Sequence, residues 1–181
     1  RQMASQKLFK ALVILIIALS FVGNFVYLGE KFEEVEPFSY ISGKVTRAEY
    51  ITLRRPEYPS IQYLNANVPK GEVIYAVFLG NRMYYSDHLM AMDYDGFFNF
   101  VRQAGDAYEL AENLEKAGYH YFLFNASLMN EFAPDFLGIK ELQNLDMFIS
   151  LYCERLYKAN DHIVFKLKPS NERDQIRADF M

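Results

Sequence analysis

The chain has few of the residues on which covalent, metal or redox chemistry depends. It contains one cysteine, Cys153, and three histidines, which excludes an internal disulfide and a cysteine-based metal cluster. The sequence also lacks the GxGxxG, GxxxxGK[ST] and GxSxG patterns of dinucleotide sites, P-loops and serine hydrolases. Cys153 precedes Glu154, whose charge opposes thiolate formation, so we interpret the cysteine as structural. We therefore expect no bound cofactor.

Positive charge is scarce beyond the first turns of the chain. Three of the 19 basic residues precede Glu30, whereas all 23 acidic residues lie from Glu30 onward, which gives that part a net charge of −7. An acidic domain is repelled by phosphate backbones, and this excludes nucleic acid as an expected partner.

The sequence does contain one long apolar run, at residues 11–28, and this run carries no charge. With Leu8 and Phe9 the run is long enough, at about 1.5 Å per helical residue, to cross a hydrocarbon core of about 30 Å. It predicts a transmembrane helix and makes the lipid bilayer an expected partner. A cleaved signal peptide is the competing interpretation, but residues 26–30 (VYLGE) make a poor cleavage site.

Charges on either side of the run predict its orientation. Arg1, Lys7 and Lys10 precede it, and an acid-rich segment, 30–36, follows it. The positive-inside rule then places the N-terminus in the cytoplasm and the later residues on the extracytoplasmic side of the inner (cytoplasmic) membrane. The chain begins at Arg1, although Met3 could serve as a start, and we expect preceding membrane spans in a longer polypeptide.

Patterning divides the chain into a helix with a basic flank (1–29), a connector (30–44), an α/β domain (45–168) and a charged tail (169–181) that we expect to fray. Two near-continuous apolar runs, 73–79 and 119–125, are typical of strands buried on both faces. Further expected elements are helices at 47–54, after 59, at 95–102, 108–117, 128–132 and 140–152, a short strand at 83–86, and a hairpin of 155–159 with 163–168. The order predicts an α/β sandwich with a mainly parallel sheet and an antiparallel edge hairpin.

The densest polar cluster follows the strand at 73–79, where open α/β sheets tend to bind ligands. Its candidate ligand-binding residues are Arg82, Tyr84, Tyr85, Asp87 and Asp93. Carboxylates beside tyrosines suit a sugar, since the rings stack on a sugar face and the carboxylates accept bonds from its hydroxyls. We assign no catalytic residue to this chain.

Two other interpretations of the cluster stay open. Asp87, His88 and Asp93 have the chemistry to hold a divalent metal. Alternatively, Asp93 and Asp95 cap the next helix while the tyrosines pack against the sheet edge. Elsewhere, His120 is expected to be a satisfied core histidine within its strand. The acceptor pattern at 125–127 ends a buried strand, so we expect it to carry no glycan.

Four segments carry a family resemblance: Lys44–Ile51 (KVTRAEYI), Tyr63–Pro69 (YLNANVP), Leu79–Tyr85 (LGNRMYY) and Leu114–Leu123 (LEKAGYHYFL). Over most of residues 8–168 the chain resembles the C-terminal extracytoplasmic region of bacterial polytopic glycosyltransferases of the dolichyl-phosphate-mannose–protein mannosyltransferase type. The resemblance implies a polyprenyl-phosphate sugar donor. It also implies catalytic carboxylates in the first external loop of the full protein, a region this sequence does not contain.

The resemblance thus implies a non-catalytic domain that covers the external face of a transferase and aids recognition of acceptor or sugar, with a glycan or lipid-linked sugar as partner. The alternative is a self-contained single-span membrane protein whose outer domain binds a small ligand or a partner protein. A third hypothesis is an independent enzyme with a site around Asp87, His88 and Asp93.

Overall fold

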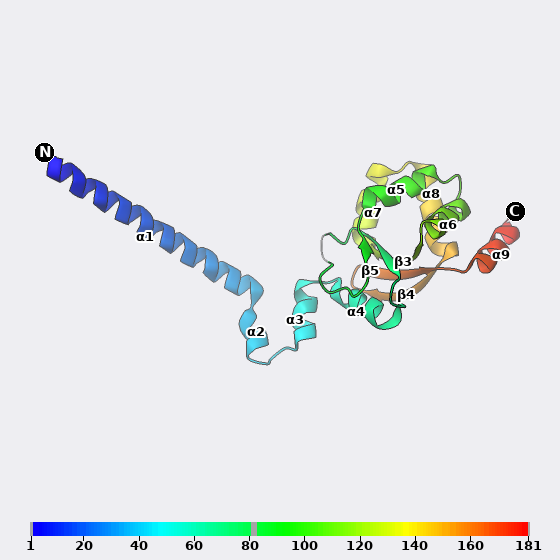
Figure 1. The fold of residues 1–181 in the computed structure, drawn as a ribbon, viewed down its shortest axis with the longest axis horizontal. Coiled ribbons are helices and arrows are strands. Elements are labelled where there is room, and N and C mark those ends of the chain that lie inside the picture. The colour runs from blue at the N-terminus through cyan, green and yellow to red at the C-terminus, as the bar shows by residue number, and fades with distance from the viewer. Residues whose placement is uncertain (1, 81–82, 181) are drawn as a thin grey trace. The chain divides into compact units, whose positions relative to one another are not determined.

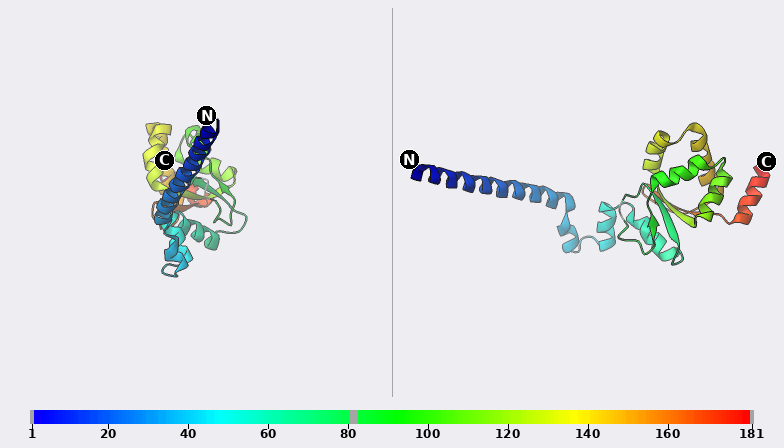
Figure 2. Two further views of the ribbon diagram at one scale, coloured as in Figure 1. Left: turned by 90° about the vertical axis from the view of Figure 1, so that its left-hand side faces the viewer. Right: turned by 45° about the horizontal axis from the view of Figure 1, so that its top comes forward.

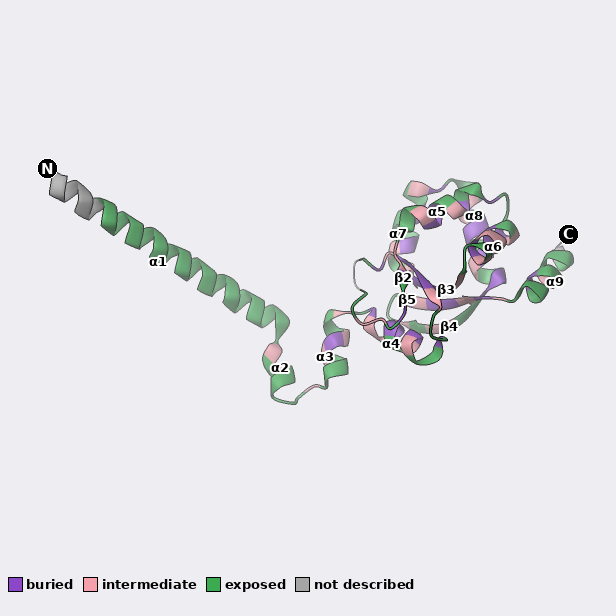
Figure 3. Cartoon of the chain, in the orientation of Figure 1, coloured by how far each residue is buried: buried purple, intermediate pink, exposed green. Residues whose placement is uncertain are grey.

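The computed structural model describes residues 2–80 and 83–180, and these fall into two compact units, residues 1–50 and residues 51–181. The first unit begins with α1 (Gln2–Val35), whose segment Phe9–Val35 is long and apolar enough to cross a membrane. All of that segment is exposed (Figure 3). By length and composition, α1 therefore agrees with the predicted membrane helix.

A sharp break ends α1. Glu36 adopts a left-handed backbone conformation (φ 45°), and Pro37 then opens the short helix α2 (Pro37–Ile41). Proline has no N–H for a helix interior and suits the first helical position, so the Glu36–Pro37 pair encodes the stop of one helix and the start of the next. The connector is thus partly helical.

Helix α3 (Arg47–Arg54) has the bounds expected from the sequence, and the boundary between the two units lies within it. The Thr46 hydroxyl accepts from the Glu49 N–H at 3.2 Å, while the Glu49 carboxylate accepts from the Thr46 N–H at 2.7 Å. These reciprocal bonds form a capping box. They also lower the pKa of Glu49, because both the backbone and the hydroxyl of Thr46 donate to its charged form.

The second unit is built on a five-stranded sheet with the order β2-β1-β3-β5-β4 (Figures 1 and 2). Its strands are β1 (Val73–Val77), β2 (Met90–Ala91), β3 (Tyr119–Asn125), β4 (Cys153–Ala159) and β5 (His162–Leu167). Strand β1 pairs in parallel with β2 and β3, whereas β5 is antiparallel to β3 and β4. The predicted α/β fold, with a parallel centre and an antiparallel edge hairpin, is confirmed.

Helices cover both faces of this sheet (Figure 1). Helix α4 (Tyr58–Asn67) places Ile61 and Leu64 against one face. The other face is covered by α5 (Tyr94–Gln103), α6 (Ala107–Lys116), α7 (Ala126–Phe136), α8 (Ile139–Met147) and a π-helical turn at Phe148–Tyr152. Phenylalanine dominates that larger core, with Phe97, Phe98 and Phe122 fully buried.

Three expectations about elements were wrong. The second strand lies at Met90–Ala91 instead of 83–86, because Ser86 exchanges bonds with His88 in a local turn and Met90 is the residue that aligns with Ile74. The helix expected at 140–152 ends at Met147 and continues as the π-helical turn. The tail does not fray but forms α9 (Ser170–Phe180), which buries Arg173.

Candidate functional site

The sheet topology itself marks one edge as a place for a ligand. After β1 the chain leads to β2, on one side, and after β3 it leads through α7 and α8 to β4, at the opposite edge. The connections of these two adjacent parallel strands therefore diverge at their carboxyl ends. Such a switch point is where open α/β sheets commonly bind ligands.

An aromatic group lies at this switch point, and we call Phe78, Tyr94, Phe98, Phe132 and Phe136 the edge cluster. Phe78 directly follows β1 and has a positive φ of 58°, which is unusual for a bulky side chain. Its ring stacks on Tyr94 at 5.3 Å and meets Phe132 at 5.9 Å. Tyr94 and Phe132 stay 41% and 37% exposed, so part of the cluster faces solvent.

Sequence reasoning missed the edge cluster. Its members come from the end of β1 and from α5 and α7, and they are up to 58 positions apart in the numbering (Phe78 to Phe136). The one local signal is the bulky Phe78 after a buried strand, where strain in a left-handed conformation is associated with functional sites. Only the fold brings the rings together.

The predicted residues Tyr84 and Tyr85 lie on a loop that is held by α4. The Asn65 side chain donates to the Tyr85 carbonyl at 2.7 Å and accepts from the Asp87 N–H at 2.9 Å. The Tyr85 ring is partly buried and meets Tyr58 edge-on at 5.1 Å, whereas Tyr84 is 70% exposed. This loop therefore presents one tyrosine to solvent and uses the other for packing.

Asp87 and Asp93 are not brought together. Asp87 is exposed beside Asn65 of α4, on the Ile61–Leu64 side of the sheet. Asp93 lies on the other side, where its carbonyl accepts from the Tyr75 hydroxyl at 2.9 Å. Burial, followed by the nearby Asp93 carboxylate, raises the pKa of Tyr75. Asp87 and Asp93 therefore lie on opposite sides of the sheet and do not form one site.

A metal site at this place is not supported by the geometry. His88 is buried, and its Nε2 lies 3.2 Å from the Leu64 carbonyl, so the ring turns into the domain and away from solvent. Within residues 2–80 and 83–180, no three His, Cys, Asp or Glu side chains gather as metal ligands would. The other predicted ligand-binding residue, Arg82, lies outside the described residues.

A buried polar group that the sequence did not reveal joins α4 to the β4–β5 hairpin. Glu57, Ser60 and His162 are all buried, and the Ser60 hydroxyl lies 3.5 Å from the His162 carbonyl. Asn125 closes β3, accepts from the Leu128 N–H at 3.1 Å and so caps α7, while its amide nitrogen lies 3.5 Å from the His162 ring.

Two remaining single-residue expectations have different outcomes. His120 is not a core residue, since its side chain is 42% exposed and its Nδ1 lies 3.1 Å from the Glu72 carboxylate at the start of the strand pair. Cys153 is buried, and burial raises the pKa of its thiol, which agrees with a structural role.

Comparison of this chain with protein-family models, curated proteins and solved structures finds no match. The geometry of the edge cluster and the tyrosine loop is therefore the basis for a functional proposal.

Proposed function

We propose that this chain is the last membrane span and the extracytoplasmic domain of a membrane glycosyltransferase with a polyprenyl-phosphate sugar donor. The domain contributes recognition and no catalytic residue. The proposal rests on the resemblance over most of residues 8–168 and on one structural observation, the partly exposed edge cluster at the switch point of a sheet.

Aromatic rings at such an edge suit carbohydrate. The C–H groups of a pyranose face make apolar contacts with a ring, and polar groups around the ring bind the hydroxyls. Tyr94 supplies both a ring and a hydroxyl, and it is held in place by Phe78 on one side and Phe136, at 5.7 Å, on another. Tyr84 offers a second exposed ring on the loop between β1 and β2.

The membrane context supports the same function. A polyprenyl-phosphate donor stays in the bilayer, so the acceptor must be held near the membrane surface for transfer. α1 is long enough to fix the domain there. The basic residues Arg1, Lys7 and Lys10 before the apolar run favour an extracytoplasmic position for the later residues.

The test uses the whole polypeptide that the genome encodes around this sequence, reconstituted in nanodiscs with polyprenyl-phosphate mannose and a soluble acceptor extract. We expect Tyr94→Ala and Tyr84→Ala to raise the apparent KM for acceptor about tenfold, equivalent to about 1.4 kcal/mol of lost binding, with little change in kcat. The control is Leu53→Ala, at a side chain of α3 that is 69% exposed and lies 25 positions before Phe78, the first member of the edge cluster.

Two results would overturn the proposal. Sugar transfer by residues 1–181 alone would place a catalytic site within this chain. No transfer by the encoded polypeptide, together with a reading frame that adds no further hydrophobic spans, would instead favour the single-span protein that binds a small ligand or a partner.

A further inference from the structure

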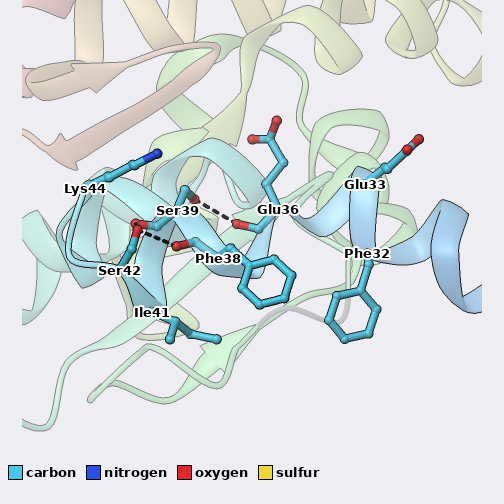
Figure 4. Close-up of a pocket in the computed structure, with 8 residues that line it drawn as sticks. All are labelled: Phe32, Glu33, Glu36, Phe38, Ser39, Ile41, Ser42 and Lys44. Atoms are coloured by element: carbon cyan, nitrogen blue, oxygen red, sulfur yellow. Dashed lines mark hydrogen bonds between the residues drawn. The ribbon is translucent and has the colours of Figure 1, made fainter.

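The corner between α1 and α2 is amphipathic. Three apolar side chains of this corner are exposed. They are Phe32 at the end of α1 (51% exposed) and, in α2, Phe38 (68%) and Ile41 (72%). The two phenylalanine rings lie 6.0 Å apart. In Figure 4 these three side chains extend to one side, while Glu33, Glu36 and Lys44 extend to the other.

This corner holds a hollow of about 690 Å³, lined by the three apolar side chains together with Glu33, Glu36, Ser39, Ser42 and Lys44. The corner belongs entirely to the unit of residues 1–50, so its shape does not depend on the placement of the other unit. An exposed apolar patch of this kind needs an apolar occupant.

Helix length locates the corner relative to a bilayer. The segment Phe9–Val35 has 27 residues, which as a helix spans about 40 Å, against about 30 Å for a hydrocarbon core. The uncharged run ends at Leu28, and Phe32 follows it by about 6 Å along the helix. Phe32 and α2 therefore fall in the headgroup layer, where aromatic side chains are favoured.

We propose that Phe32, Phe38 and Ile41 insert into the bilayer interface, so that α2 lies on the membrane surface beside the end of α1. Phe32 lies four residues, about one helical turn, after Leu28, so it is on the same face of α1 as the end of the apolar run. Glu33, Glu36 and Lys44 then face water. The occupant of the hollow is acyl chain and glycerol backbone from the adjoining leaflet.

Backbone bonding fits this position, because a partly dehydrated site penalises unpaired polar groups. The Ser42 hydroxyl donates to the Phe38 carbonyl at 2.6 Å, and the Ser39 hydroxyl donates to the Glu36 carbonyl at 2.8 Å. The Lys44 N–H is bonded to the Ser39 carbonyl at 3.0 Å. The turn after α2 thus satisfies these groups internally.

The charge of residues 30–44 indicates what attracts this segment to the membrane. Residues 30–44 contain four glutamates and two lysines, so anionic headgroups do not attract this segment. Apolar insertion remains as the driving force, and the depth of the corner should not increase when anionic lipid is added.

The chain contains no tryptophan, so single-tryptophan variants report on one site each. Residues 1–181 are reconstituted in phosphatidylcholine vesicles as Phe38→Trp, Phe21→Trp and Glu33→Trp. Phe21 lies within the apolar run, and Glu33 lies on the charged side of the corner (Figure 4). Emission maxima, iodide quenching and quenching by lipids brominated at shallow or deep acyl positions are measured.

We expect Phe38→Trp to emit at shorter wavelength than Glu33→Trp and to be quenched mainly by shallow bromines, whereas deep bromines quench Phe21→Trp. Equal iodide quenching of Phe38→Trp and Glu33→Trp, with Phe21→Trp still deep, would overturn the interfacial position of α2 alone. Iodide quenching of Phe21→Trp would overturn the membrane position of α1 and, with it, that of α2. Neither result depends on glycosyltransferase activity.

Discussion

The two units of this chain use the same apolar residue types in opposite ways. In Phe9–Val35 leucine, isoleucine, valine and phenylalanine are exposed along the whole helix, whereas in residues 51–181 these types fill two cores on either side of a sheet. A helix with apolar side chains on all sides has no partner for them in water. The second unit therefore buries its apolar side chains in its own cores, whereas the first unit depends on an apolar environment outside the chain.

Matched leucine-to-arginine substitutions, one in each unit, give the strongest test of this difference between the two units. Leu114 of α6 is fully buried in the larger core. Leu114→Arg places an unpaired charge there, and we expect a loss of more than about 4 kcal/mol in the free energy of unfolding. Circular dichroism melts of residues 1–181 in detergent would show it. Unfolding like that of the parent chain would show that this core does not stabilise the domain.

The same substitution in α1 should have the converse effect. Leu19 lies near the middle of the apolar run and is 62% exposed. Leu19→Arg is expected to cost about 3 kcal/mol of insertion free energy and to leave the melting temperature of the domain unchanged. Glycosylation-tag insertion assays in microsomes measure the first quantity. Full insertion of the variant would argue against a membrane-spanning α1.

A third substitution tests how much a buried polar contact, the one between α9 and α6, contributes to the stability of the second unit. Arg173 of α9 is 1% exposed, and its guanidinium donates to Glu115 of α6. Its Nε and Nη1 have no hydrogen-bond partner among the described residues. Glu115→Ala leaves the buried guanidinium without its hydrogen-bonded carboxylate, and we expect about 3 kcal/mol of destabilisation.

The control for that variant is Arg173→Met, which removes the charge and keeps much of the volume. Replacement of a buried ion pair by apolar groups is often close to neutral, so this variant should unfold at a higher temperature than Glu115→Ala. Equal stability of the two would show that the ion pair, and not the burial of an unpaired charge, carries the effect. Thermal melts at neutral pH decide between them.

Periodicity and caps in the sequence predicted most of the second unit. The runs that became β1 and β3 are almost entirely apolar, with His120 and Asn125 of β3 as the polar exceptions, because both faces of a central strand are covered. The helices expected at 47–54 and after 59 correspond to α3, which Thr46 caps, and to α4, which has a proline in its first turn. Helix caps and apolar runs depend on residues that are close in sequence, so they can be recognised without knowledge of the tertiary structure.

The errors arose where distant residues decide the outcome. His120 looked like a core residue by alternation, but the Glu72 carboxylate from the start of β1 keeps it at the surface. The tail looked like solvated charge, yet Arg173 finds Glu115, which lies 58 positions earlier. Asp87 and Asp93 are close in sequence and separated by the sheet, whereas Phe78 and Phe136 are distant in sequence and share the edge cluster.

The smallest predicted effect also concerns the contact between α9 and α6. The Tyr108 hydroxyl donates to the Asp174 carboxylate at 2.5 Å, and the Arg177 guanidinium lies 4.3 Å from the Tyr108 ring. Donation to Asp174, with a smaller contribution from burial, raises the pKa of Tyr108 to about 12 from an ordinary value of 10.0. The folded state therefore holds this proton more tightly than the unfolded state.

Stability from this proton is complete below pH 10 and is lost as the pH rises through about 12, because the unfolded tyrosine ionises first. Tyr108→Phe lacks the contact at every pH. We expect the parent chain to melt slightly higher than Tyr108→Phe at pH 8 and the difference to shrink between pH 10 and 12. A constant difference across that range would mean that Asp174 does not accept from Tyr108.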